Sequence, residues 1–192
     1  MDIRFISLAC LILCSCTGKS QNRFKYIAEQ ALPFCVEAKM DTGICFLVDM
    51  SIPSGKNRLV VWDFEKQKSI RSGLCTHGTC NAKGFEYSSE PQFSNVPESH
   101  CSSLGKYRIG KRAWSSWGIN IHYKLHGLEA SNDKAFPRIV VFHSWDIVPN
   151  HEIHPRRAPE SWGCPAVSNE FMRYADSLLQ SRERPVLLWI VK

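Results

Sequence analysis

The sequence lacks several features that would assign it quickly to a class of protein. No apolar run reaches the roughly 20 residues that a membrane-spanning helix needs. No CxxC or HExxH motif marks a zinc site, and no internal repeat is visible. Basic residues do not alternate with aromatic ones as in a nucleic-acid-binding stripe. What remains is a chain of 192 residues, 44% apolar and 22% charged, which is typical of one globular domain.

The N-terminal apolar segment, Phe5 to Leu13, is too short to span a bilayer and is typical of a signal peptide. It ends in "LCSC", where Ser15 precedes Cys16. This pattern resembles a bacterial lipobox, in which the cysteine receives lipid and becomes the new N-terminus. A plain secretory signal cut nearby is the alternative. We predict a lipoprotein signal peptide over 1–15, a tether over 16–23 and a single domain over 24–192.

The net charge and the predicted export limit the classes of binding partner that we expect. Removing residues 1–15 takes away one acid, Asp2, and one base, Arg4, so the formal charge of +6 is kept. A positive charge favours anionic surfaces or polymers. Because the protein is expected in the bacterial envelope, anchored through lipid on Cys16 and facing the periplasm, nucleic acid is not an expected partner.

Six cysteines remain beyond the predicted lipobox: Cys35, Cys45, Cys75, Cys80, Cys101 and Cys164. In an oxidising envelope these thiols can form disulfides, although spacing alone does not give the connectivity. The short separations make a Cys35–Cys45 bridge and a Cys75–Cys80 bridge plausible. Cys101 and Cys164 would then be left over, and a bridge between them is the structural alternative to a reactive Cys164.

The pattern of apolar residues predicts a mainly β domain with two helices. An N-terminal helix is expected over 24–40, broken or bent at Pro33. A second helix is expected from Ser168 or Asn169 onward, with one apolar face. Between and after them we expect strands within 44–50, 57–73, 106–114, 118–129, 138–145 and 185–191. This content favours a β-sandwich or a barrel-like sheet.

A histidine and a cysteine are placed where a nucleophilic site could form. His143 ends the apolar run "RIVVFHSW", and Cys164 follows a polar loop in "PESWGCPAV". Gly163 permits a sharp turn, and the N–H groups of Gly163 and Cys164 could stabilise an oxyanion. A thiolate nucleophile needs such a turn, a base and nearby N–H donors. The pattern therefore indicates Cys/His acyl transfer.

The order of strand, histidine, spacer, S-x-G-C and helix resembles the YkuD-type murein L,D-transpeptidase catalytic domain. Further matching segments are "THGTC", "FSNVPESHCSSLGKY" and "LHGLEASNDKAFPRIVVFH", with "SWGCPAV" pointing to the branch with an S-x-G-C-P-A motif. The resemblance covers residues 44–192. It implies an L,D-transpeptidase fold, with Cys164 as nucleophile, His143 as base and the backbone carbonyl of Ser144 orienting the imidazole.

The long irregular loop over 75–105 is expected to build part of the site, because such loops in compact domains tend to be functional. The resemblance places "THGT" and "SSLG" beside the cleft, so His77 and Ser103 are candidate substrate-binding residues. Trp162 is a third candidate and stands where the better-known branch has histidine. A zinc site made by Cys164, His143, His151 and His154 is the alternative use of these side chains.

We therefore expect an exported cysteine acyltransferase that acts on peptidoglycan stem peptides. A thiolate activated by imidazolium needs no metal, so no cofactor is expected. Two alternatives stay open. The same Cys/His site could act as an L,D-carboxypeptidase or cross-link hydrolase, or the chain could be a non-catalytic, disulfide-stapled envelope-binding module in which Cys164 is bridged.

Overall fold

The computed structural model describes residues 10–80 and 90–192, with side chains from residue 22 onward. The helices are α1 (Cys10–Glu37) and α2 (Asn169–Gln180). The strands are β1 (Ile44–Asp49), β2 (Leu59–Asp63), β3 (Lys68–Gly73), β4 (Gly105–Trp114), β5 (Ile121–Gly127), β6 (Val141–Ser144), β7 (Ala166–Val167) and β8 (Leu187–Val191). The expected mainly β fold with two helices is confirmed.

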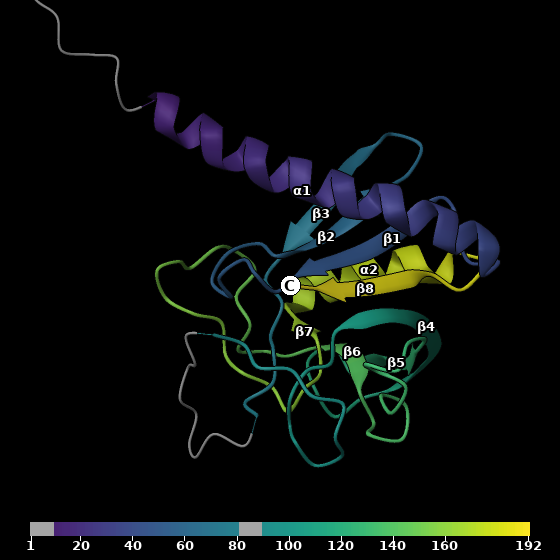
Figure 1. The fold of residues 1–192 in the computed structure, drawn as a ribbon. Helices are drawn as coiled ribbons and strands as arrows, with labels where there is room; N and C mark the ends of the chain where they lie inside the picture. The colour runs from purple at the N-terminus through teal and green to yellow at the C-terminus, as the bar shows by residue number, and fades with distance from the viewer. Residues whose placement is uncertain (1–9, 81–89) are drawn as a thin grey trace, which may run out of the picture.

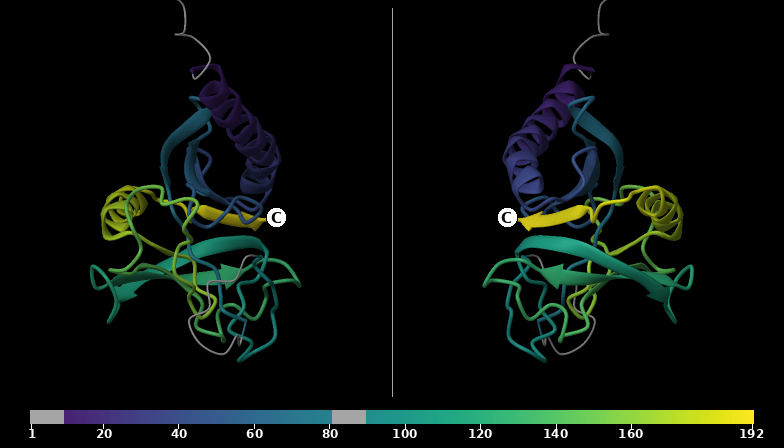
Figure 2. Two further views of the ribbon diagram at one scale, coloured as in Figure 1. Left: turned by 90° about the vertical axis from the view of Figure 1, so that its left-hand side faces the viewer. Right: turned by 90° about the vertical axis from the view of Figure 1, so that its right-hand side faces the viewer.

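All the strands of the described residues belong to one eight-stranded sheet, ordered β3-β2-β1-β8-β4-β5-β6-β7. It is a single curved, barrel-like sheet, not two stacked sheets (Figures 1 and 2). Most neighbours are antiparallel, but β8 runs parallel to β1, and β7 runs parallel to β6. Strand β8 therefore joins the first part of the chain to the part that carries the site.

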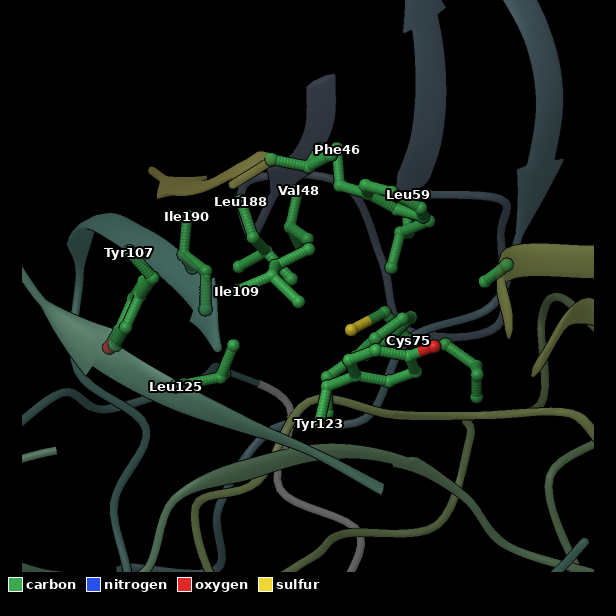
Figure 3. Close-up of a cluster of buried hydrophobic side chains, with 14 of the residues drawn as sticks. Phe46, Val48, Leu59, Cys75, Tyr107, Ile109, Tyr123, Leu125, Leu188 and Ile190 are labelled. Carbon is green, nitrogen blue, oxygen red and sulfur yellow. The ribbon is translucent and has the colours of Figure 1, made fainter. Parts of the chain in front are cut away.

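The two helices cover opposite faces of the central strands (Figure 2). Phe46 and Val48 of β1 point into the core that α2 closes, while Cys45 and Leu47 point into the core beneath α1. This alternation follows from the period of two residues in a strand. Because both faces are covered, every residue of β1 is buried. Figure 3 shows the first of these cores, between β1, β8, β4 and β5.

Helix α1 differs in part from the sequence expectation. It continues through Pro33 to Glu37 without a break, and a bend at Pro33 stays a prediction. Residues 16–23, the predicted tether, lie within this helix. Of the predicted signal peptide, residues 1–9 lie outside the described residues. A helical conformation decides neither cleavage nor lipidation at Cys16, so these boundaries stay predictions. No described helix is long and apolar enough to cross a membrane.

Helix α2 begins where the sequence indicated. Ser168 is its N-cap, and the Ser168 hydroxyl accepts a hydrogen bond from the N–H of Phe171 at 3.1 Å. The buried face includes Phe171, Met172 and Ala175. The helix follows β7 directly, so its packing against the core fixes the position of the short segment between Cys164 and Ser168.

Candidate active site

Cys164 lies in a tight turn just before β7. The Ser161 hydroxyl donates to the carbonyl of Cys164 at 2.6 Å and accepts from the N–H of Gly163 at 3.2 Å. Gly163 has φ +103°, and a Cβ atom there would lie 2.6 Å from the carbonyl oxygen of Cys101. A side chain would be strained and would clash with backbone, so the turn requires glycine.

The "THGT" segment holds this turn from the other side. The Thr76 hydroxyl donates to the Cys164 carbonyl at 2.9 Å and accepts from the N–H of Ala166 at 2.9 Å. The N–H of Thr76 also donates to the carbonyl of Ala166 at 2.9 Å. Thr76 thus fixes the backbone on both sides of Pro165, and sequence reasoning, which singled out its neighbour His77, missed this role.

The sulfur of Cys164 lies against the backbone that leads into β6. The N–H of Val141 donates to Sγ at 3.5 Å, and Sγ lies 3.9 Å from the carbonyl oxygen of Ile139. Burial raises the pKa of Cys164 above its usual value, while the Val141 N–H and the charge of Arg138 oppose this shift. The resting group at neutral pH is therefore a thiol, which needs a base to become a nucleophile.

His143 lies in β6, directly across from Ala166 of β7 and His122 of β5. Its Nδ1 lies 2.9 Å from the carbonyl oxygen of Ser144. Since a carbonyl only accepts, Nδ1 carries the proton and Nε2 is the basic nitrogen. Burial, with a smaller contribution from His122, lowers the pKa of His143 below its usual value. The imidazole is therefore neutral at pH 7 and able to accept a proton.

Cys164 thus lies in the turn two residues before Ala166, the β7 residue that pairs with His143. Among the described residues, the hydrogen-bond partners of Sγ are the backbone groups of Val141 and Ile139, and the imidazole of His143 is not one of them. Catalytic hydrogen bonds are often looser without substrate. Proton transfer between Cys164 and His143 stays a prediction.

Arg138 is a site residue that the sequence analysis missed. Its guanidinium donates to the carbonyl of Cys101 and to the hydroxyl of Ser103, both at 2.7 Å, and to the carbonyl of Ser94 at 3.0 Å. These bonds hold the 94–103 segment against Gly163, next to the nucleophile candidate. Arg138 was read as the first residue of a strand, so no pattern marked it as functional.

The three predicted substrate-binding residues differ in accessibility. His77 is 2% exposed: its Nδ1 lies 2.9 Å from the Arg58 guanidinium, and its Nε2 lies 3.5 Å from a carboxylate oxygen of Glu160. Burial, then the charges of Arg58 and Arg157, lowers the pKa of His77 to about 3. The ring is therefore neutral, and its contact with Glu160 is not an ion pair. The side chain of His77 supports the turn from within the protein.

Ser103 is also buried, and its hydroxyl donates to the carbonyl of Ser94 at 2.9 Å while accepting from Arg138. Trp162, in contrast, is 73% exposed and stacks on His100 with ring centroids 4.8 Å apart. Of the three predicted residues, Trp162 alone presents its side chain to solvent beside Cys164. Contact of any of them with substrate stays a prediction.

The disulfide pattern corrects two expectations. Cys80 pairs with Cys101, whereas Cys35, Cys45, Cys75 and Cys164 are free thiols. The expected Cys75–Cys80 and Cys35–Cys45 bridges are therefore absent, because the fold brings Cys80 to the more distant Cys101 and buries the other thiols in the cores. Cys164 is not bridged, which removes the basis for the non-catalytic, disulfide-stapled alternative.

Within residues 10–80 and 90–192, no cluster of three or more His, Cys, Asp or Glu side chains is arranged to hold a metal ion. His151 and His154 are exposed in the loop that precedes the Cys164 turn. The alternative zinc site built from these histidines, His143 and Cys164 is therefore not formed in this structure.

Comparison with known proteins identifies the family. The family described as L,D-transpeptidase catalytic domain matches residues 19–187, which is most of the chain. The chain belongs to this family. The predicted family is therefore confirmed, whereas the branch with an S-x-G-C-P-A motif stays a prediction. No curated protein sequence matches the chain.

Solved structures similar to this chain include the helical cell shape determining protein Pgp2 from Campylobacter jejuni, at 12% identity over 78% of this chain and 47% of that chain, with TM-score 0.48. Bd1075 from Bdellovibrio bacteriovorus matches at 16% identity over 77% and 48%, with TM-score 0.47. An L,D-transpeptidase from Xylanimonas cellulosilytica matches at 12% over 78% and 60%, with TM-score 0.41. The chain spans about half the length of these structures.

Proposed function

We propose that this L,D-transpeptidase forms a thioester between Cys164 and a peptidoglycan stem peptide. The observation that supports this proposal is the placement of a free, turn-mounted thiol beside β6, whose His143 has a neutral imidazole with Nε2 as its basic nitrogen. These are the parts that nucleophilic catalysis by a thiol requires. The Ser144 carbonyl orients the base, as the resemblance implied.

The proposed first step transfers an acyl group to sulfur. As Sγ attacks the carbonyl carbon of the diamino acid at the third stem position, the thiol proton moves to Nε2 of His143. The C–N bond to the terminal D-residue then breaks, and the imidazolium returns the proton to the leaving amine. The product is a Cys164 thioester and a free D-amino acid, and no oxidant, reductant or metal is consumed.

The oxyanion of this step needs hydrogen-bond donors near the turn. The N–H groups of Gly163 and Cys164 are the candidates from sequence, and that of Gly163 donates to the Ser161 hydroxyl in this structure. We propose that the oxyanion of the substrate replaces the Ser161 hydroxyl as acceptor of the Gly163 N–H. The Ser161 hydroxyl would keep its hydrogen bond to the Cys164 carbonyl. Replacement of Ser161 by Ala should therefore loosen the turn while leaving the Gly163 N–H available.

In the second step, an amine or water attacks the thioester. An amine gives a cross-link or an attached protein, and water gives L,D-carboxypeptidase or cross-link hydrolysis. We propose transfer to an amine of a second stem peptide as the main outcome. Purified enzyme incubated with a tetrapeptide-bearing muropeptide should give a cross-linked dimer and the free D-residue by mass spectrometry. A trimmed tripeptide without dimer would assign the hydrolytic alternative, and unchanged substrate would contradict both.

We further propose that the protein is exported to the bacterial envelope and anchored by lipid on Cys16, with the catalytic domain in the periplasm. A short apolar segment followed by "LCSC" supports this placement. Metabolic labelling with a fatty-acid analogue should tag the native chain and spare Cys16→Ala. Equal labelling of both would show that Cys16 is not the anchor.

A further inference from the structure

A groove of about 740 Å³ lies on the β4–β5 part of the sheet, and neither Cys164 nor His143 lines it. One wall comes from β4 and β5, and the other comes from residues 182–186, between α2 and β8. Strand β8 pairs with β4 only from Gly105 to Arg108. The remainder of β4 therefore has an edge that faces the groove.

The lining of this groove is strongly cationic. It contains Arg108, Lys111, Arg112, Lys124, Arg182 and Arg184, against a single acidic residue, Glu183. Arg112 is paired with Asp176, at 2.7 Å between Nε and Oδ1. In the described part of the chain, none of the other five cations forms an ion pair with an acidic side chain. Such a concentration of uncompensated charge attracts anions.

The pKa of His126, which also lines the groove, is consistent with a cationic lining. Burial lowers the pKa of His126, and the charges of Arg108 and Lys124 lower it further. His126 also stacks on Phe136 with centroids 4.7 Å apart, and Nζ of Lys124 lies 5.2 Å from the centroid of the same ring. The groove thus combines cations with an exposed aromatic wall, which suits a ligand with both carboxylate and apolar groups.

Strand β5 connects this groove to the candidate active site. In β5, Tyr123 and Leu125 are buried, whereas His122, Lys124 and His126 are partly exposed on the opposite face. His122 is paired with His143, and Lys124 is paired with Val141, whose N–H contacts Sγ of Cys164. A chain lying along this face of β5 would therefore lead from the cationic groove to the nucleophile candidate.

We propose that the groove binds the carboxylate-bearing stem peptide of a peptidoglycan strand, outside the position where acyl transfer occurs. This inference rests on the proposed function for its ligand. Arginine guanidinium groups match planar carboxylates in a bidentate arrangement, and the exposed ring of Phe136 provides an apolar contact. A peptide is chosen over a phosphate polymer because the groove leads along β5 to a site that reacts with peptides.

The test uses the full chain carrying Cys164→Ala, so that binding is measured without turnover. Binding to insoluble peptidoglycan is compared, by co-sedimentation, for this chain and for the same chain with Lys111→Gln and Arg184→Gln. Both residues are exposed. The matched control carries Lys25→Gln and Lys68→Gln, two exposed residues on α1 and β3 with the same charge change.

We expect the groove variant to bind at least fivefold more weakly and the control to stay within twofold. Amidation of the peptidoglycan carboxylates should weaken binding of the unsubstituted chain to the level of the groove variant. Equal binding by both variants would overturn the proposal. Loss of binding to phosphatidylglycerol vesicles in the groove variant, with peptidoglycan binding unchanged, would assign the groove to lipid phosphate and would also overturn it.

A separate measurement distinguishes failure of this proposal from failure of the proposed function. With Cys164 present, the Lys111→Gln/Arg184→Gln chain should react with a small thiol reagent at the same rate as the native chain, since neither residue lies in the Cys164 turn. Release of the terminal D-residue from a soluble muropeptide tests the proposed function. If the native chain does not release the D-residue but binding still depends on the groove, the binding site is supported and the acyl-transfer proposal is contradicted.

Discussion

The two halves of the sheet differ in how they are covered. Strands β1 and β2 are buried along their whole length, with α1 on one face and the core closed by α2 on the other. Strand β5 instead alternates between buried residues and partly exposed ones. The covered half is a scaffold, and the open half carries the partly exposed His122, the buried His143 and the partly exposed Cys164. The comparison indicates that stability and chemistry are carried by different strands and can be changed separately.

The largest effect on chemistry is expected for the base in the open half. Replacing His143 by Ala removes the neutral imidazole that accepts the thiol proton, so acylation should slow by about 10²–10⁴-fold. The rate of acyl-enzyme formation, followed by intact-protein mass, measures this loss. His151→Ala, an exposed histidine in the preceding loop, is the control and should keep the native rate. Equal rates for both variants would remove His143 from the mechanism.

The matching substitution in the covered half should affect stability and spare the chemistry. Leu47 of β1 is fully buried beneath α1, so Leu47→Ala should lower the free energy of unfolding by about 2–5 kcal/mol. Chemical denaturation measures this change. Under native conditions, the reactivity of Cys164 should stay within about twofold, since Leu47 faces away from the core shared with the site. A large loss of Cys164 reactivity in folded Leu47→Ala protein would contradict the claim that the two halves can be changed separately.

Arg138 gives a more specific test of this comparison, because its charge affects the pKa of Cys164 in the open half. Its charge opposes the rise in the pKa of Cys164, so Arg138→Gln should move the alkylation profile of the thiol to higher pH. A shift to higher pH means less thiolate, and so slower alkylation, at a given pH. Arg138→Lys should recover part of the shift. If Arg138→Gln lowers stability without moving the profile, Arg138 has only a structural role.

The last prediction concerns the pH dependence of Cys164 alkylation in the native protein, where the expected effect is the smallest. Burial raises the pKa of Cys164 and lowers that of His143, so the neutral pair, thiol and imidazole, is favoured at pH 7. The rate of alkylation by iodoacetamide should therefore keep rising with pH beyond the usual cysteine value of 9.0, as thiolate forms. A plateau near neutral pH would instead show a stable thiolate–imidazolium pair.

The covered half could be predicted well from sequence, because a continuous apolar run such as "ICFLVD" is a local signal of a buried strand. Helix α2 and the part of α1 from Phe24 to Glu37 were also predicted from local patterns, whereas residues 10–23 were not predicted as helix. The parallel pairing of β1 with β8 and the two-residue strand β7 were missed. Pairing between distant segments, and strands this short, leave no periodic pattern in a single sequence.

The open half was predictable only where a motif marks it. The Gly163–Cys164 turn and the histidine at the end of a strand were proposed from their spacing, whereas the orienting role of the Ser144 carbonyl came from the family resemblance and stays a prediction. Arg138 and Thr76 were missed because their roles depend on contacts with the 94–103 segment and the Cys164 turn, which lie far from them in sequence. The Cys80–Cys101 pairing likewise depends on tertiary structure.

The most direct test of the account is whether Cys164 becomes covalently acylated. The native protein is incubated with a carbapenem, and the intact mass and peptide map are recorded beside Cys164→Ser. A single adduct on Cys164, absent from the serine variant and from the buried thiols Cys35, Cys45 and Cys75, is the predicted result. An adduct that persists in Cys164→Ser, or none in the native protein, would contradict the claim that Cys164 is the nucleophile.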